Sequence, residues 1–179
     1  QCLEVVFRTL AAVLLVDYLR GPRDDRIEGF FPKLTGPSTG QWVDLVRETV
    51  RVIGARTELE PFMPEAYAWY FNSKGKPSQA AEGVNALVAR RNDENHGRSK
   101  APAAERAREF QDELRKLFQW LRWLPCYRVF VVNDSVARRS GGHKGKVQFF
   151  SGREPLPEPE TITWDTRLFE GAVYVVSPD

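Results

Sequence analysis

The feature that most constrains the fold is a stripe of apolar residues at helical spacing between residues 107 and 124, with charged residues between them. This spacing predicts an amphipathic helix that begins near Pro102 and buries one face. Trp120 and Trp123 flank the stripe and widen the surface that can be buried, either in the same core or against another subunit. The stripe consists of Ala107, Phe110, Leu114, Leu117, Phe118, Leu121 and Leu124.

The periodicity changes after this stripe. Residues 126–132, 147–150 and 172–176 are rich in valine and aromatic residues, which is typical of strands. Upstream, residues 2–20, 41–53, 64–71 and 79–96 carry helical patterns. The chain is therefore predicted to be an α+β protein, mainly a bundle of four to five helices over residues 1–124. A small β-rich subdomain, a hairpin or a strand meander, is expected over residues 125–179.

Several helix boundaries are marked by local signals. The first helix is apolar on nearly every side, which predicts a central, surrounded helix. Ser38 and Gln41 have the spacing of a capping box. Pro64 suits the first turn of a short helix. Ser78 is expected to cap the helix that Gly97 ends.

Composition limits the classes of function. Lysine and arginine number 26 against 24 acidic residues, a net charge of +2, so any nucleic-acid binding must be local. Cys2 and Cys126 are too few for a disulfide framework, and we expect a reduced, cytoplasmic protein without a metal site or cofactor. The longest apolar run, residues 10–16, is far shorter than the roughly 20 residues that span a bilayer, so we expect no membrane partner.

The two ends of the sequence suggest a domain of a longer protein. It has no initiator methionine and no signal-peptide pattern, and it stops directly after a strand-like run. We therefore expect other domains of a full-length protein among its partners.

The helix expected over residues 79–96 has an apolar stripe that ends in polar residues. The apolar stripe of Val84, Leu87 and Val88 continues to Arg91 and then Asn95. A guanidinium on a line that faces the core is costly unless it meets an anion, a partner subunit or water.

The segment 91–97, with sequence RNDENHG, resembles the signature of the HEPN superfamily: an arginine, a polar residue, three further residues and a histidine. The resemblance covers about residues 40–124 and is supported by the long amphipathic helix that follows. It implies a metal-independent ribonuclease that acts on RNA as a homodimer, with a site where two copies of the motif face each other. On this resemblance Arg91, Asn92 and His96 are the catalytic candidates.

The residue types suit that chemistry. Asn92 and His96 are four residues apart and share a helix face, with Arg91 adjacent, so we expect the three to converge on one phosphate. Histidine can transfer a proton near neutral pH, and arginine can bind a phosphate through two hydrogen bonds. Asp93 and Glu94 would repel RNA unless they pair with nearby cations. Those cations, Arg90, Arg98 and Lys100, are also candidate RNA contacts.

A second basic segment lies at residues 138–146, which carry four formal positive charges and no acid. As a flexible, glycine-rich loop it would follow an RNA backbone through Arg138, Arg139, Lys144 and Lys146. The alternative is a solvated hairpin connection without a binding role.

A non-catalytic interpretation competes with the ribonuclease hypothesis. Arg91 would then pair with an acid in the motif or on another helix, and His96 would cap the helix C-terminus. The domain would serve as a dimerisation, sensing or docking module of a larger bacterial protein. The aromatic cluster Trp69, Tyr70 and Phe71, like the two tryptophans of the stripe, is interpreted as core rather than as a platform for bases.

Overall fold

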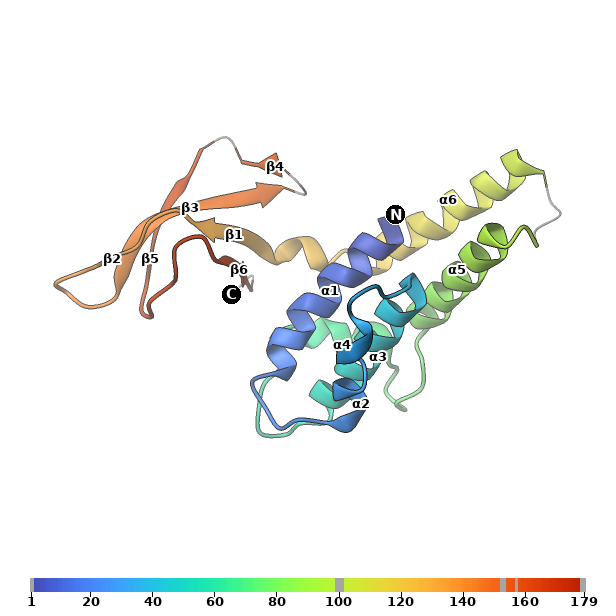
Figure 1. Cartoon of the computed structure of the whole chain (residues 1–179), viewed down its shortest axis with the longest axis horizontal. Coiled ribbons are helices and arrows are strands. Elements are labelled where there is room, and N and C mark those ends of the chain that lie inside the picture. Colours follow the sequence, from blue (N-terminus) through green and yellow to red (C-terminus); the bar gives the residue numbers. More distant parts are fainter. Residues whose placement is uncertain (1, 99–101, 152–153, 157, 178–179) are drawn as a thin grey trace. The chain divides into compact units, whose positions relative to one another are not determined.

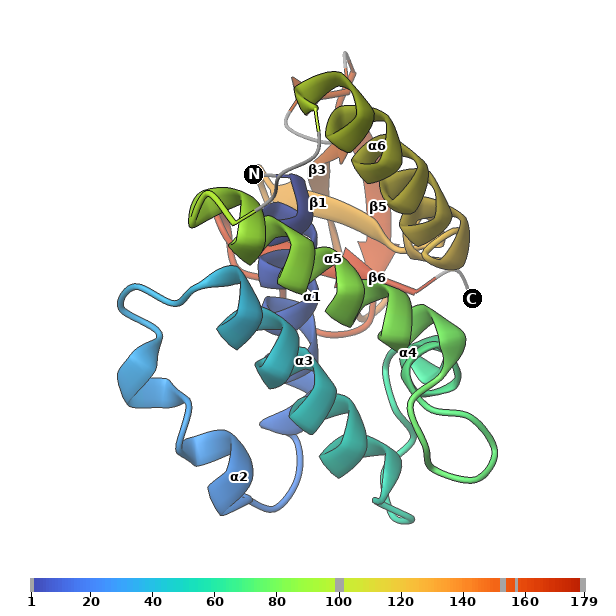
Figure 2. The same ribbon diagram turned by 90° about the vertical axis from the view of Figure 1, so that its right-hand side faces the viewer.

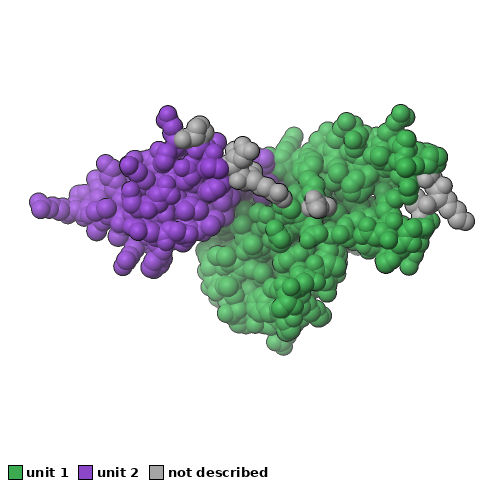
Figure 3. Space-filling model, turned by 45° about the horizontal axis from the view of Figure 1, so that its top comes forward, with its two compact units in different colours: residues 1–122 green, residues 123–179 purple. Residues whose placement is uncertain are grey.

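The computed structural model describes residues 2–98, 102–151, 154–156 and 158–177. The chain forms two compact units, Gln1–Arg122 and Trp123–Asp179 (Figure 3). The division expected from the sequence lies two residues later, after residue 124. Helices make up the first unit and antiparallel strands the second, so the predicted α+β class is confirmed.

The first unit contains four long helices and two short ones among its described residues (Figure 1). The short α2 was not predicted from the sequence. No helix in the described part of the chain is long and apolar enough to cross a membrane. The elements are α1 (Cys2–Tyr18), α2 (Asp25–Glu28), the 3-10 helix η1 (Phe31–Lys33), α3 (Thr39–Gly54), α4 (Pro64–Tyr70), α5 (Gln79–Asn95) and α6 (Ala103–Trp120).

The core of this unit lies where α1 packs against α3. Phe7 and Leu10 of α1 are fully buried, as are Leu45 and Val46 of α3. The prediction of a surrounded first helix is wrong, because Val5 and especially Val16, 66% exposed, face solvent. Only the residues at three- and four-residue spacing along α1 meet its neighbours.

The predicted helix starts are confirmed. The Ser38 hydroxyl accepts from the Gln41 amide at 3.3 Å, and the Gln41 side chain accepts from the Ser38 amide at 2.7 Å, which completes a capping box. Ser78 caps α5 by accepting from the Ala81 amide. Pro64 occupies the first turn of α4.

Helices α5 and α6 form an antiparallel hairpin (Figure 2). The side chain of Trp120 lies directly over Gly83 of α5, where a Cβ atom would collide with the indole ring. A glycine within a helix costs stability, but here it allows close approach of the two helices. Of the predicted stripe on α6, Leu117 and Leu121 are buried and Phe118 is exposed, so the first unit covers only part of this apolar face.

Two buried or half-buried polar groups tie the connecting segments to α1. The carboxylate of Asp17 accepts from the Phe62 amide at 2.8 Å and from Arg20 at 2.7 Å. The guanidinium of Arg56 donates to the carbonyls of Tyr18 at 2.9 Å and Pro22 at 2.7 Å. The segment that follows α3 is thereby held against the end of α1 and the residues just after it.

The aromatic cluster of α4 belongs to the core, as interpreted from the sequence. Trp69, Tyr70 and Phe71 are all buried. The Tyr70 hydroxyl has no hydrogen-bond partner among the described residues, and burial raises the pKa of this phenol to about 12.

The second unit is an antiparallel sheet arranged around one long central strand, β3. Strand β1 pairs with β3 on one side and with β6 on its other edge, and β5 pairs with the opposite edge of β3. After the 3-10 helix η2 (Leu124–Cys126), the strands are β1 (Arg128–Val132), β2 (Val136–Ala137), β3 (His143–Ser151), β4 (Glu154–Pro155), β5 (Glu160–Trp164) and β6 (Val173–Val176).

One face of this sheet carries the core of the second unit. Phe130, Val132, Val147 and Phe149 are buried there, and half-buried side chains such as Trp164 of β5 pack against them. Strands β1 and β6 match predicted strands, and β3 begins four residues earlier than the strand predicted over 147–150. Strand β5 was not predicted, although its alternation of threonine with isoleucine and tryptophan is a strand signal.

Replacement of Tyr70 by phenylalanine should be tolerated at neutral pH, because it removes a buried hydroxyl without a partner. We expect Tyr70→Phe to unfold within about 1 kcal/mol of the parent in urea at pH 7. Its phenol contributes stability that is complete below the unfolded pKa of about 10 and is lost as the pH rises through about 12. The parent should therefore lose stability more steeply than Tyr70→Phe in this interval.

Tyr67→Phe provides the matched control, since Tyr67 lies on the same helix and is 37% exposed. This variant should follow the parent through the alkaline range. A loss of several kcal/mol by Tyr70→Phe at pH 7 would mean that the hydroxyl has a partner and would contradict the prediction.

Removal of the Asp17 carboxylate should destabilise the first unit. Asp17→Ala leaves the Phe62 amide without this acceptor, and we expect a loss of about 2 kcal/mol in urea unfolding. Asp44→Ala is the control, because Asp44 forms a half-exposed pair with Arg47 and should cost less than about 0.5 kcal/mol. Equal losses in the two variants would disprove a special role for Asp17.

Candidate functional site

The predicted motif occupies the last turn of α5 and the turn that ends it. The Gly97 amide donates to the Glu94 carbonyl at 3.1 Å, and the Arg98 amide donates to the Asp93 carbonyl at 2.9 Å. These two bonds form a Schellman motif, and Gly97 supplies the required left-handed conformation with a φ of 63°. His96 is the C-cap residue immediately before this glycine. Its backbone position is thereby fixed by the helix end.

Arg91 lies on the inward side of α5, as the apolar stripe predicts. Its guanidinium is 3.9 Å from the carboxylate of Glu4 on α1, and its side chain is 31% exposed. A half-exposed pair at this distance contributes little to stability. Arg91 therefore has an acid on another helix as its neighbour and remains accessible to a stronger anion.

Asn92 and His96 are both exposed on the last turn of α5. Successive residues of an α-helix are about 100° apart around the helix axis, so the side chains of Asn92 and Arg91 point in different directions. Asn92 and His96 are four apart and share a side of the turn. In one chain the expected convergence of all three residues on a single phosphate is therefore not seen, because Arg91 faces the helices and the other two face solvent.

The acids inside the motif have cationic partners. Asp93 lies 3.8 Å from Arg98, and Glu94 forms a 2.6 Å salt bridge with Arg106 of α6. Pairing with Arg98 was anticipated from the sequence, but Arg106 was not. Arg90 pairs instead with two acids of α6, Glu109 at 2.9 Å and Glu113 at 3.4 Å. Lys100 lies outside the described residues.

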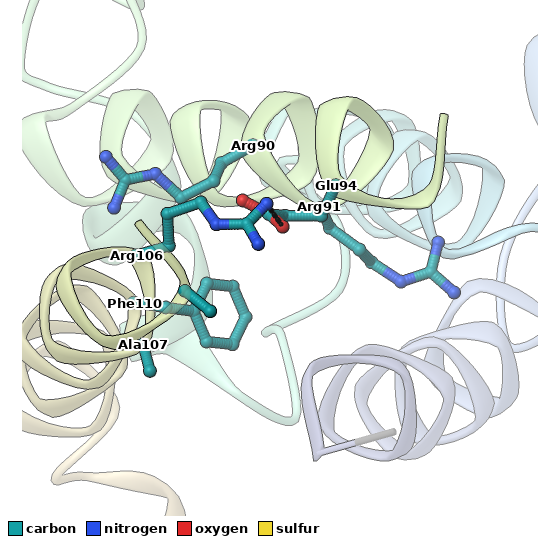
Figure 4. A pocket seen from close by; sticks show the side chains of 7 residues that line it. Arg90, Arg91, Glu94, Arg106, Ala107 and Phe110 are labelled. Atoms are coloured by element: carbon teal, nitrogen blue, oxygen red, sulfur yellow. Dashed lines mark hydrogen bonds and ion pairs between the residues drawn. The ribbon is translucent and has the colours of Figure 1, made fainter. Parts of the chain in front are cut away.

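A pocket of about 310 Å³ opens between α5 and α6 beside Arg91 (Figure 4). The ring of Phe110 forms one wall, and the Glu94–Arg106 pair lies at one edge, while Arg91 extends on the far side. This pocket, hereafter the Phe110 pocket, is lined by Arg90, Arg91, Glu94, Ala103, Arg106, Ala107 and Phe110.

Sequence reasoning missed Arg106 and Phe110 as parts of the site. Phe110 was assigned to a buried face, yet it is only half-buried and borders the pocket. A signal was present, because Ala103 and Ala107 precede it at helical spacing and small side chains leave space on a helix surface. The cross-helix partner of Glu94 could not be found without knowing how α5 and α6 align.

The basic residues of the second unit lie on a hairpin. Arg138 and Arg139 are exposed in the turn after β2, where the Arg138 amide donates to the Gly142 carbonyl at 3.0 Å. Lys144 and Lys146 are exposed on one face of β3, paired with threonines of β5. The prediction of a loop over residues 138–146 is therefore wrong from His143 onward, and the segment is a hairpin connection followed by a strand.

No cluster of three or more potential metal ligands occurs among the residues whose positions are described. Cys2 and Cys126 are both free and exposed. No family model, characterised protein or solved structure matches the chain.

The left-handed turn that positions His96 should depend on glycine. Gly97→Ala forces a side chain into a φ of 63°, and we expect a loss of about 1 kcal/mol in thermal unfolding of the first unit. Gly36→Ala is a matched control, because a Cβ atom there meets nothing within 4 Å and its φ is not positive. A Gly97→Ala variant as stable as the Gly36→Ala control would show that the turn tolerates L-residues.

Proposed function

We propose that this chain supplies one half of a metal-independent ribonuclease site, in which two copies combine Arg91, Asn92 and His96. The observation that carries the proposal is the exposure of Asn92 and His96 together on a hydrogen-bonded helix end that also carries Arg91. The proposal follows the resemblance of this segment to the HEPN signature. A single copy offers one imidazole and one guanidinium, whereas two copies offer an acid and a base as well as two anion-binding groups.

The roles follow from the side chains. One His96 imidazole accepts a proton from a ribose 2′-hydroxyl, and its symmetry mate donates a proton to the leaving oxygen. Arg91 exchanges its long contact with Glu4 for hydrogen bonds to the phosphate, where it stabilises charge that grows in the transition state. Asn92 donates its amide hydrogens to a phosphate oxygen.

The charge distribution around the motif supports an anionic substrate. Asp93 and Glu94 are paired with Arg98 and Arg106, which weakens the repulsion that these acids would exert on RNA. In the second unit, Arg138, Arg139, Lys144 and Lys146 are exposed and form no ion pair with an acid among the described residues, so they are available to RNA phosphates. Among the described candidates, Arg90 is the least available to RNA, since two acids hold it.

The apolar face of α6 supports a homodimer. Phe118 is 48% exposed and Leu114 is half-buried, so part of this face is uncovered in one chain. Burial of such side chains is a common source of association energy. A second copy on this face would bring two α5–α6 hairpins together.

Loss of the imidazole should abolish cleavage without unfolding the protein. We expect His96→Ala to lower the cleavage rate of single-stranded RNA at least about 100-fold, the lower range for a lost general acid or base. Because His96 is exposed, its thermal unfolding midpoint should match that of the parent. His143→Ala, which removes the other histidine, should leave cleavage unchanged.

Cleavage that persists in His96→Ala, or is absent from a well-folded parent dimer on varied RNA, would disprove the ribonuclease proposal. The second candidate is a non-catalytic dimerisation or docking module, which the contact of Arg91 with Glu4 favours, because it gives the arginine a protein partner. If a mass measurement shows that the parent is a dimer, and the parent neither binds nor cuts RNA, this second candidate is supported.

A further inference from the structure

The Phe110 pocket combines features that suit a flat ligand with both polar edges and a charge. Phe110 offers an aromatic face, and the small Ala103 and Ala107 leave space next to it on α6. Its volume of about 310 Å³ lies at the lower end of the range of small-ligand sites. An aromatic ring that is only half-buried on such a wall can stack with another ring.

The edge of the pocket presents both an acceptor and a donor. Glu94 Oε2 accepts from Arg106 Nη1 at 2.6 Å. A carboxylate has room for about four hydrogen bonds and a guanidinium carries five N–H groups, so both members of the pair can bond further. A ligand that fits this edge needs an oxygen beside N–H donors.

Guanine has this pattern on its Watson–Crick edge. Its O6 can accept from Arg106, and the adjacent N1–H and N2–H groups can donate to Glu94. Adenine lacks the carbonyl oxygen, while uracil and cytosine do not present two neighbouring N–H donors beside an oxygen acceptor. The edge is free only in an unpaired base, and single-stranded RNA is commonly recognised by stacking such bases on aromatic side chains.

Arg91 connects this pocket with the motif. Its guanidinium extends on the side of the pocket opposite Phe110, where it can meet a phosphate attached to the bound nucleoside (Figure 4). We propose that the Phe110 pocket binds an unpaired guanine of single-stranded RNA and thereby places the neighbouring phosphate at Arg91. This inference rests on the proposed ribonuclease function and specifies its substrate.

The test compares binding of short fluorescent oligonucleotides that carry one guanosine, inosine or adenosine in a uridine background. A 2′-fluoro backbone prevents cleavage through the 2′-hydroxyl, and anisotropy gives Kd for the full chain. We expect guanosine to bind about tenfold more tightly than inosine, which lacks the N2 amine, and adenosine to bind at least as weakly as inosine. This comparison changes only the ligand, so misfolding cannot explain its result.

Protein variants test whether the preference for guanosine arises at the Phe110 pocket. Phe110→Ala should weaken binding of the guanosine oligonucleotide about tenfold, and Glu94→Gln should remove its advantage over adenosine. Phe169→Ala and Glu109→Gln are the controls: Phe169 is a 63% exposed phenylalanine of the second unit, and Glu109 joins the same two helices without lining this pocket. Both controls should retain the preference.

Equal Kd values for guanosine and adenosine oligonucleotides, or binding unaffected by Phe110→Ala, would overturn the inference. So would conversion of the dimer to a monomer by Phe110→Ala, because the pocket face would then lie between copies. Cleavage of ordinary RNA, measured separately, distinguishes the two proposals. Guanine-selective binding without cleavage would overturn only the ribonuclease, and cleavage indifferent to guanine and to Phe110 would overturn only the pocket.

Discussion

Glu94 on α5 and Arg106 on α6 form a 2.6 Å salt bridge near the end of the helix hairpin. The fully buried apolar residues of the stripe, Leu117 and Leu121, lie at the C-terminal end of α6. Charged pairs connect α6 to α5 nearer its N-terminal end. Two long side chains that meet at their tips hold the helix backbones further apart than packed methyl groups would. The same pair leaves space beside Arg91, and it gives Glu94, an acid of the motif, a cationic partner. The accessible pocket and the reduced repulsion of anions therefore have one physical origin.

Features that depend on neighbouring residues could be predicted from the sequence. Ser38 and Gln41 cap one helix, Ser78 caps another, and Gly97 ends it, because each of these interactions is completed within about one helical turn. The change from helical to strand periodicity likewise indicated the α+β class and the order of its two parts. The inward direction of Arg91 followed from the spacing of Val84 and Leu87, which are buried.

Features that depend on alignment between distant segments could not be predicted. Periodicity shows which face of α6 is apolar but not how much of its length a neighbour covers, so the exposure of Phe118 in one chain could not be predicted. Glu4 meets Arg91 only because α1 passes the end of α5, which no local pattern reveals. Strand β5 was missed although its own alternation of threonine with isoleucine and tryptophan is regular.

Gly83 has a wider consequence than a single close contact. At its level the indole of Trp120 rests against the backbone of α5, whereas toward the motif the helices are bridged by arginine and glutamate side chains. The hairpin therefore tapers, with a fixed narrow end and a wide end that bears the polar residues. In such a wedge, the width available to a ligand at the wide end depends on the spacing of the helices at the narrow end as well as on the residues that touch the ligand. A residue without a side chain thus helps to set the dimensions of a pocket that it does not line.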